Sequence, residues 1–174
     1  VYHKWLFYFS NLILQTAKQV RVGENGKTFK MYKFRSMFVN ADKMLDKLKE
    51  QNDVDGPMFK MKRDPRVTKI GHFIRKHSLD ELPQFFNVLK GDMSLVGPRP
   101  PLPSEVEEYS EYDKQRLFVI PGCTGLWQAT ERNEVGFNEM VQLDIQYIQR
   151  ASFTFDLWII WKTVEIVIKP NGSY

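Results

Sequence analysis

The chain has 174 residues, of which 43% are hydrophobic and 14% aromatic, so it can bury one sizeable core and is expected to form a single domain. Its formal net charge of +4 suits acidic ligands (nucleotides, lipid phosphates, an anionic membrane face or nucleic acid) without choosing among them. Cys123 is the only cysteine, which excludes an intrachain disulfide, indicates a reducing compartment and argues against a Cys/His zinc site.

The first predicted elements are a short apolar segment and a β-hairpin. Residues 5–14 are apolar over about half the length that a membrane span needs, so no complete transmembrane helix is expected. Residues 23–26 contain two glycines and an asparagine, and they separate residues 20–22 from the alternating segment 28–34. This pattern predicts two antiparallel strands joined by a tight turn.

Apolar residues at helical spacing predict the remaining elements. The predicted helices cover residues 38–51, 68–76, 104–118, 138–150 and 153–168, and residues 121–125 are expected to form a tight loop. In the last helix one stripe contains Leu157, Ile160, Trp161, Val164 and Ile168. By pattern alone, core packing of this stripe is favoured over a membrane-surface role, although the tryptophans and the basic charge raise the membrane alternative. The predicted fold class is α+β: a small antiparallel β element near residues 20–37 with several amphipathic helices, some of them at a membrane interface.

Residues 78–104 carry the most informative pattern. Asp80 and Glu81 are adjacent carboxylates, and Arg99 follows in a turn bracketed by prolines, which together suit a phosphorylated substrate. By spacing alone, Ser78 and Glu81 more often form a capping box at a helix start. Pro83 complicates that interpretation, because it lies past the positions where a missing N–H is harmless. The segment therefore begins either later, near Leu82, or with a distorted turn.

Six motifs in order give the chain a resemblance to bacterial sugar transferases, specifically the monotopic polyprenyl-phosphate phosphoglycosyl transferases that initiate capsule, exopolysaccharide and O-antigen synthesis. The resemblance covers about residues 18–169. The motifs are Arg21-Val-Gly, Tyr32-Lys-Phe-Arg-Ser-Met37, Asp64-Pro-Arg-Val-Thr-Lys-Ile-Gly71, Ser78-Leu-Asp-Glu-Leu-Pro-Gln84, Gly91-Asp-Met-Ser-Leu-Val-Gly-Pro-Arg-Pro100 and Pro121-Gly-Cys-Thr-Gly-Leu-Trp-Gln128. Each motif alone is weak, and their common order makes a chance similarity improbable.

The resemblance implies transfer of hexose-1-phosphate from a UDP-sugar to undecaprenyl phosphate, with release of UMP. It assigns Asp80 as the nucleophile that forms a phosphosugar intermediate, and Glu81 as a ligand of Mg²⁺. Because adjacent helical residues do not face each other, the two acids are expected to have distinct roles.

The resemblance also assigns four cations to substrate binding: Arg75 and Arg99 contact the diphosphate or the lipid phosphate, and Lys33 and Arg35 are further phosphate ligands. Guanidinium groups suit phosphate oxygens because they can donate two parallel hydrogen bonds. For Lys33 and Arg35, a solvated strand face is an equally good interpretation of the pattern alone.

The expected partners are a UDP-sugar, polyprenyl phosphate and the anionic membrane surface, with no nucleic acid and no oligomeric state implied. The expected location is the cytoplasmic face of the bacterial plasma membrane, with monotopic or peripheral attachment. Residues 1–17 are interpreted as a truncated or altered membrane anchor and residues 18–174 as the catalytic domain. The alternatives are a catalytically silent fragment or a basic, non-enzymatic module that binds anionic lipid or nucleic acid.

Overall fold

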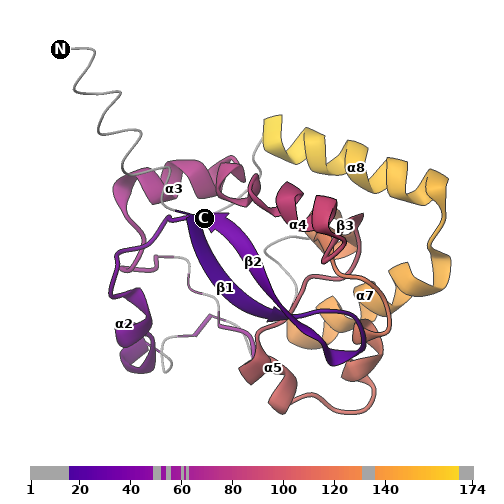
Figure 1. Cartoon of the computed structure of the whole chain (residues 1–174), viewed down its shortest axis with the longest axis horizontal. Coiled ribbons are helices and arrows are strands. Elements are labelled where there is room, and N and C mark those ends of the chain that lie inside the picture. Colours follow the sequence, from indigo (N-terminus) through magenta and orange to yellow (C-terminus); the bar gives the residue numbers. More distant parts are fainter. Residues whose placement is uncertain are drawn as a thin grey trace.

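The computed structural model describes residues 16–48, 52–53, 56–59, 61, 63–130 and 136–168. Figure 1 shows a two-stranded hairpin crossing the molecule, with helices around it and α3, α4 and α8 along one edge. This arrangement confirms the predicted α+β class. Within the described ranges, no helix is long and apolar enough to cross a membrane. The predicted anchor region lies almost wholly outside these ranges.

Fourteen short elements make up the described part of the chain. The strands are β1 (Thr16–Val22), β2 (Thr28–Phe34), β3 (Ser94–Val96) and β4 (Gly122–Thr124). The α-helices are α2 (Ala41–Leu48), α3 (Lys69–Lys76), α4 (Gln84–Lys90), α5 (Pro103–Glu107), α6 (Leu126–Thr130), α7 (Phe137–Arg150) and α8 (Phe153–Ile168). Three 3₁₀ turns complete the set: η1 (Glu24–Gly26), η3 (Leu79–Glu81) and η4 (Asp113–Leu117).

The predicted hairpin is confirmed. β1 and β2 pair antiparallel, with Thr16 opposite Phe34 and Val22 opposite Thr28. The turn between them contains Asn25 at φ 54°, a left-handed conformation that asparagine tolerates better than most residues. The alternation of β2 places Met31 in the interior, so one face of the hairpin packs against the rest of the domain.

Four of the five predicted helices are present near their predicted bounds. α3 begins where expected because the Thr68 hydroxyl accepts a hydrogen bond from the Gly71 N–H at 2.9 Å, which satisfies a free donor of the first turn. Gly71 is required there, since a Cβ at this position would lie 2.0 Å from the carbonyl oxygen of Ser36. α2 is shorter than the predicted helix over residues 38–51, of which residues 49–51 lie outside the described ranges.

The single helix predicted over residues 104–118 is wrong. The chain forms α5, then a turn, then η4. The Asp113 carboxylate accepts hydrogen bonds from the Ser110 N–H at 2.9 Å and the Ser110 hydroxyl at 2.7 Å, a local alternative to helical bonding. This break lets Tyr109 and Arg116 both enter the interior, where the Arg116 guanidinium donates to the Tyr109 hydroxyl at 2.8 Å.

The loop predicted over residues 121–125 contains a strand instead. β4 pairs in parallel with β3, with Ser94 opposite Gly122 and Val96 opposite Thr124. Gly122 permits this pairing, because an added Cβ would lie 2.1 Å from the backbone nitrogen of Gly97. Each strand has only three residues, so the sequence carries too little alternation to reveal them.

The orientation of α8 differs from the one favoured by pattern alone. Its buried face contains the fully buried Ile159, which packs in a cluster with Val96, Leu126, Ala129 and Tyr147. Much of the stripe assigned to the core is exposed instead, at Leu157, Trp161, Val164 and Ile168. The core-packing interpretation is therefore wrong for these four residues, whereas Ile160 of the same stripe packs against the buried cluster. α8 thus presents an apolar surface to its surroundings.

Candidate functional site

The two acidic residues of the dyad lie in a distorted turn and not in a capped helix. Ser78 has φ 54°, in the left-handed region, and its side chain makes no capping hydrogen bond to the turn, so the predicted capping box is wrong. η3 follows, and α4 begins at Gln84 after Pro83. The alternative of a distorted start is confirmed. A non-glycine residue at positive φ stores strain, and such residues gather at functional sites.

Asn87 fixes this turn against the hairpin. Its fully buried side chain accepts a hydrogen bond from the Tyr32 N–H at 3.0 Å and donates to the carbonyl oxygen of Lys30 at 2.9 Å. α4 is therefore joined to the edge of β2. The preceding turn consequently lies beside Lys33, whose ammonium group donates to a carboxylate oxygen of Glu81 at 2.7 Å.

Asp80 and Glu81 occupy different environments, as expected from their adjacent positions. Asp80 is buried, with 7% of its surface exposed, whereas the Glu81 side chain is more than one-third exposed. Burial raises the pKa of the Asp80 carboxyl group, and the neighbouring charges of Lys33 and Arg75 only partly oppose that rise. A raised pKa marks a carboxylate whose charge is poorly solvated, which increases its reactivity towards an electrophile.

The turn that carries Arg99 is held from three elements. Arg116 of η4 donates to the Arg99 carbonyl at 3.2 Å, and Arg21 of β1 donates to the Pro100 carbonyl at 3.0 Å. A carboxylate oxygen of Glu105 in α5 accepts from the Leu102 N–H at 2.8 Å and from the Arg99 guanidinium at 3.2 Å. Prolines remove backbone freedom on both sides of Arg99, so the guanidinium is held in a preformed position.

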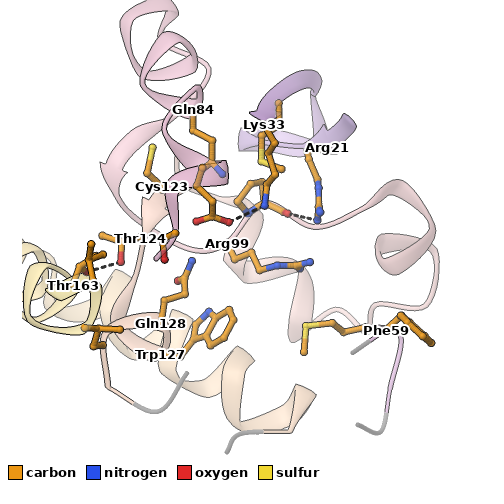
Figure 2. A pocket seen from close by; sticks show the side chains of 18 residues that line it. Arg21, Lys33, Phe59, Gln84, Arg99, Cys123, Thr124, Trp127, Gln128 and Thr163 are labelled. Carbon is orange, nitrogen blue, oxygen red and sulfur yellow. Dashed lines mark hydrogen bonds and ion pairs between the residues drawn. The ribbon is translucent and has the colours of Figure 1, made fainter. Parts of the chain in front are cut away.

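A cavity of about 310 Å³ lies between these elements. Figure 2 shows its lining side chains, with Lys33, Arg21 and Arg99 on one side and Thr163 of α8 on the other. Its polar lining includes Arg21, Lys33, Glu81, Arg99, Thr124 and Gln128, and its apolar lining includes Met31, Met58, Phe59, Trp127, Ile166 and Val167. One chamber therefore offers cationic groups to an anion and an apolar wall to a nonpolar group.

The structure brings three of the six predicted site residues together at this cavity: Lys33, Glu81 and Arg99. Asp80 is buried next to Glu81 and does not line the chamber. Arg75 and Arg35 also lie outside the lining, so the structure does not bring them to the same chamber. The Arg75 guanidinium donates to the Ser36 hydroxyl at 2.8 Å, which joins α3 to the segment after β2.

The available oxygen ligands fit Mg²⁺ better than zinc. Among the described residues, no group of three or more His, Cys, Asp or Glu side chains could hold a metal by itself. Mg²⁺ commonly uses one or two carboxylates together with waters and substrate phosphates. Glu81 is the one carboxylate among the described residues that line the cavity, and it suits this ion. Cys123 also lines the cavity, but burial raises the pKa of its thiol to about 11, which keeps it protonated and unreactive.

The sequence interpretation missed several residues that line the cavity. Arg21 belongs to a motif of the resemblance, yet its place in a strand gave no sign of a ligand. Trp127 and Gln128 enter the cavity from α6, and Thr163 enters from α8, where its hydroxyl lies 2.8 Å from the hydroxyl of Thr124. No pattern in the sequence distinguished Thr163 from the other polar residues of α8.

Comparison with known proteins gives this site its context. A family model described as "Bacterial sugar transferase" matches residues 8–170. The chain belongs to this family. It is 53% identical over 156 residues to galactosyl transferase CpsE of Streptococcus agalactiae serotype III, an alignment that covers 89% of this chain and 35% of that protein.

Two further relatives carry informative names. The chain is 46% identical over 158 residues to undecaprenyl-phosphate galactose phosphotransferase of Salmonella typhimurium, covering 88% of this chain and 33% of that protein. It is 42% identical over 158 residues to exopolysaccharide production protein ExoY of Rhizobium meliloti, covering 88% of this chain and 70% of that protein. The chain thus spans about a third of the length of CpsE and of the Salmonella relative.

Proposed function

We propose that this chain transfers a hexose-1-phosphate from a UDP-sugar to undecaprenyl phosphate and releases UMP. The observation that carries the proposal is the cavity in which Lys33, Glu81 and Arg99 converge, with α8 forming one of its walls. The cations suit the diphosphate of the donor, and the apolar wall suits a lipid acceptor. The names of the relatives support galactose as the first sugar to test.

The proposed reaction has two steps at one phosphorus atom. First, a carboxylate oxygen of Asp80 bonds to the sugar-linked phosphorus, the bond from that phosphorus to the UMP oxygen breaks, and UMP leaves with the electron pair. Then a phosphate oxygen of undecaprenyl phosphate bonds to the same phosphorus, and the bond to Asp80 breaks to restore the carboxylate. Because Asp80 lies beside the cavity, its side chain must turn towards the chamber for the first step.

Glu81 and the cavity-lining cations have positioning roles in this proposal. Glu81 would hold Mg²⁺, which when bound neutralises charge on the diphosphate. Lys33 and Arg99 each pair with a carboxylate, at 2.7 Å to Glu81 and 3.2 Å to Glu105, so both cations are already oriented before the donor binds. Groups oriented in advance stabilise developing charge at little reorganisation cost.

We also propose that the chain works at the anionic surface of the plasma membrane. α8 exposes Leu157, Trp161 and Val164, and α4 exposes Phe86 and Leu89. Both helices lie along the same edge of the molecule in Figure 1. Apolar and aromatic side chains on helices can enter the headgroup region without crossing the bilayer. Contact at this edge would bring the lipid acceptor to the α8 wall of the cavity.

The deciding experiment measures UMP release and the covalent intermediate separately. The chain is incubated in detergent with Mg²⁺, undecaprenyl phosphate and, in turn, UDP-galactose, UDP-glucose and the N-acetylated UDP-sugars. Without the lipid acceptor, the correct donor should add the mass of one hexose phosphate to the peptide that contains Asp80. Absence of UMP release with every donor would contradict the proposal, and a non-enzymatic anion-binding module would then explain the cavity better.

A further inference from the structure

Arg21 is a buried arginine that has no carboxylate of the described residues within ion-pair distance. It lies in β1 with 6% of its surface exposed, and its side chain lines the cavity. Nε and Nη2 donate to the Gln19 side-chain oxygen at 3.2 and 2.7 Å, and Nη1 donates to the Pro100 carbonyl at 3.0 Å. A guanidinium has five N–H donors, so these three bonds leave two donors uncommitted among the described residues.

The other buried arginines of the described ranges are neutralised. Arg66 pairs with Asp64 at 2.6 Å, and Arg116 pairs with Asp144. For Arg21, no described carboxylate oxygen lies within the 4.0 Å that defines an ion pair. A buried charge is costly unless it is paired, and for Arg21 the more distant carboxylates of Glu105 and Glu81 offset only part of the cost of burial.

The positive charge of Arg99 adds to the cost of burying Arg21. Figure 2 shows the guanidinium groups of Arg21 and Arg99 near each other at the same end of the cavity. Burial, followed by the repulsion from Arg99, lowers the pKa of Arg21 to about 9, so the group still carries its charge at neutral pH. A bound anion between two such cations would relieve both the desolvation and the repulsion.

We propose that Arg21, together with Arg99, binds the phosphate that leaves with the nucleotide, at the UMP end of the donor diphosphate. This inference rests on the proposed function of the site and adds a phosphate ligand from β1 to it. A guanidinium fork matches two phosphate oxygens, and the hydrogen bond from Arg21 to Pro100 sets its orientation relative to Arg99.

The position of Arg21 and Arg99 in the cavity favours binding of the nucleotide phosphate over binding of the lipid phosphate. Thr163, Ile166 and Val167 of α8 form one wall of the cavity, and Figure 2 shows Arg21 and Arg99 on the side away from Thr163. An acceptor that arrives along the apolar surface of α8 reaches the Thr163 side first. The opposite end, lined by the two guanidinium groups, is left for the hydrophilic part of the donor.

Direct binding measurements test this inference without turnover. Isothermal titration with UMP and with uridine is made on the chain and on Arg21→Met, Arg21→Lys and Lys114→Met. Arg21→Met should weaken UMP binding about tenfold or more and leave uridine binding unchanged, because only UMP carries the phosphate. Arg21→Lys keeps the charge but loses the fork, so an intermediate loss is expected. Lys114 is an exposed cation outside the cavity, so Lys114→Met controls for net charge and should bind UMP as the original chain does.

Three outcomes would overturn the inference. Unchanged UMP binding in a folded Arg21→Met variant, with an unchanged KM for undecaprenyl phosphate, would remove Arg21 from phosphate binding altogether. Equal losses for UMP and uridine would show a structural role only. Unchanged UMP binding with a raised KM for undecaprenyl phosphate would overturn the nucleotide assignment and move the acceptor phosphate to this end. Failure of the proposed function is a separate result, because UMP binding can depend on Arg21 even if no UDP-sugar is turned over.

Discussion

The buried ion pair between Arg116 and Asp144 gives the sharpest test of how the fold holds the site. The two side chains are 0% and 1% exposed, and the Arg116 guanidinium also donates to the carbonyl oxygen of Arg99. Asp144→Asn leaves the arginine charge buried without its counter-charge, which costs about 3–5 kcal/mol of unfolding free energy. In a domain of this size each 1 kcal/mol lowers Tm by about 2–4 °C, so a fall of roughly 6–20 °C is expected.

A double-mutant cycle separates the cost of breaking the pair from the cost of replacing it. Arg116→Met with Asp144→Leu removes both charges and keeps apolar volume, so we expect an unfolding free energy close to that of the original chain. The assay is urea unfolding of the four proteins at neutral pH, with the m-value as a check on two-state behaviour. Lys162→Met breaks an exposed pair with Glu165 and serves as a control that should cost less than about 1 kcal/mol.

The cycle also tests the link to function. If Arg116 supports the turn through the Arg99 carbonyl, the double variant should keep its Tm but show a raised KM for the donor. Additive losses in the cycle, or single variants that cost less than about 1 kcal/mol, would refute the reasoning about an uncompensated buried charge. An unchanged KM in the stable double variant would refute the proposed support of Arg99.

Three further predictions concern the acidic dyad and the membrane. Asp80→Asn should abolish transfer almost completely. The pKa of Asp80 is raised in the folded state, so the stability of the original chain falls as the pH rises from the unfolded-state pKa of Asp80 towards its folded-state pKa. Asp80→Asn should not show this fall when melting is measured against pH. The variant should also be at least as stable as the original chain at neutral pH. Glu81→Gln should shift the Mg²⁺ dependence of the rate to higher Mg²⁺ concentrations. Lys33→Met breaks the same ion pair but keeps the carboxylate, so it should not cause this shift. Superimposed Mg²⁺ titrations for the original chain and Glu81→Gln would show that Glu81 is not a ligand. The chain should float with anionic liposomes at low salt and dissociate from them at high salt. Trp161→Ser should weaken flotation more than Val39→Ser, since Val39 is an exposed residue before α2 and outside α8. Equal flotation of the two variants would contradict a role for α8.

Local patterns predicted those elements that depend on local chemistry. The hairpin follows from a four-residue turn and alternation, and α3 follows from apolar residues at helical spacing, to which the structure adds Thr68 as the cap. The parallel pairing of β3 with β4 depends on the close approach of Gly97 and Gly122, segments far apart in the sequence, and no local period encodes it. The break between α5 and η4 depends on Ser110 and Asp113, whose spacing is also compatible with a helix.

Periodicity identified which residues of α8 share a face but not what that face contacts. Its spacing grouped Leu157 with Trp161 correctly, and hydrophobicity then favoured burial of this stripe. The side chain of Ile159 is no larger than those of its apolar neighbours, yet Ile159 enters the core. The reason is that α6, β3 and Tyr147 of α7 pack against that side of the helix. Which face of an apolar helix is buried is decided by tertiary packing, and a helix at a membrane surface can be apolar on both sides.

The residues of the candidate site also fall into two groups: those that the sequence predicted and those that only the fold revealed. Motifs drew attention to Lys33, Glu81 and Arg99, all of which line the cavity, because unusual residue combinations such as an acidic dyad and a proline-bracketed arginine are visible in the sequence. Arg21 occupies an ordinary strand position, and its burial depends on the carbonyl of Pro100, which lies 79 residues away in the chain. Such a contact becomes visible only when the hairpin and the proline-rich turn are placed together.

The backbone of that turn explains why arginines surround it. Pro100 and Pro101 have no N–H, so the turn cannot bond its own carbonyl oxygens in the way that a helix or a strand does. The Pro100 carbonyl accepts from Arg21, the Pro101 carbonyl accepts from the Val22 N–H at 2.9 Å, and the Arg99 carbonyl accepts from Arg116. Two of these three donors are cations, so satisfying the backbone also concentrates positive charge around Arg99. The same contacts that stabilise the turn thus prepare one end of the cavity for an anion, which ties the stability of this region to its chemistry.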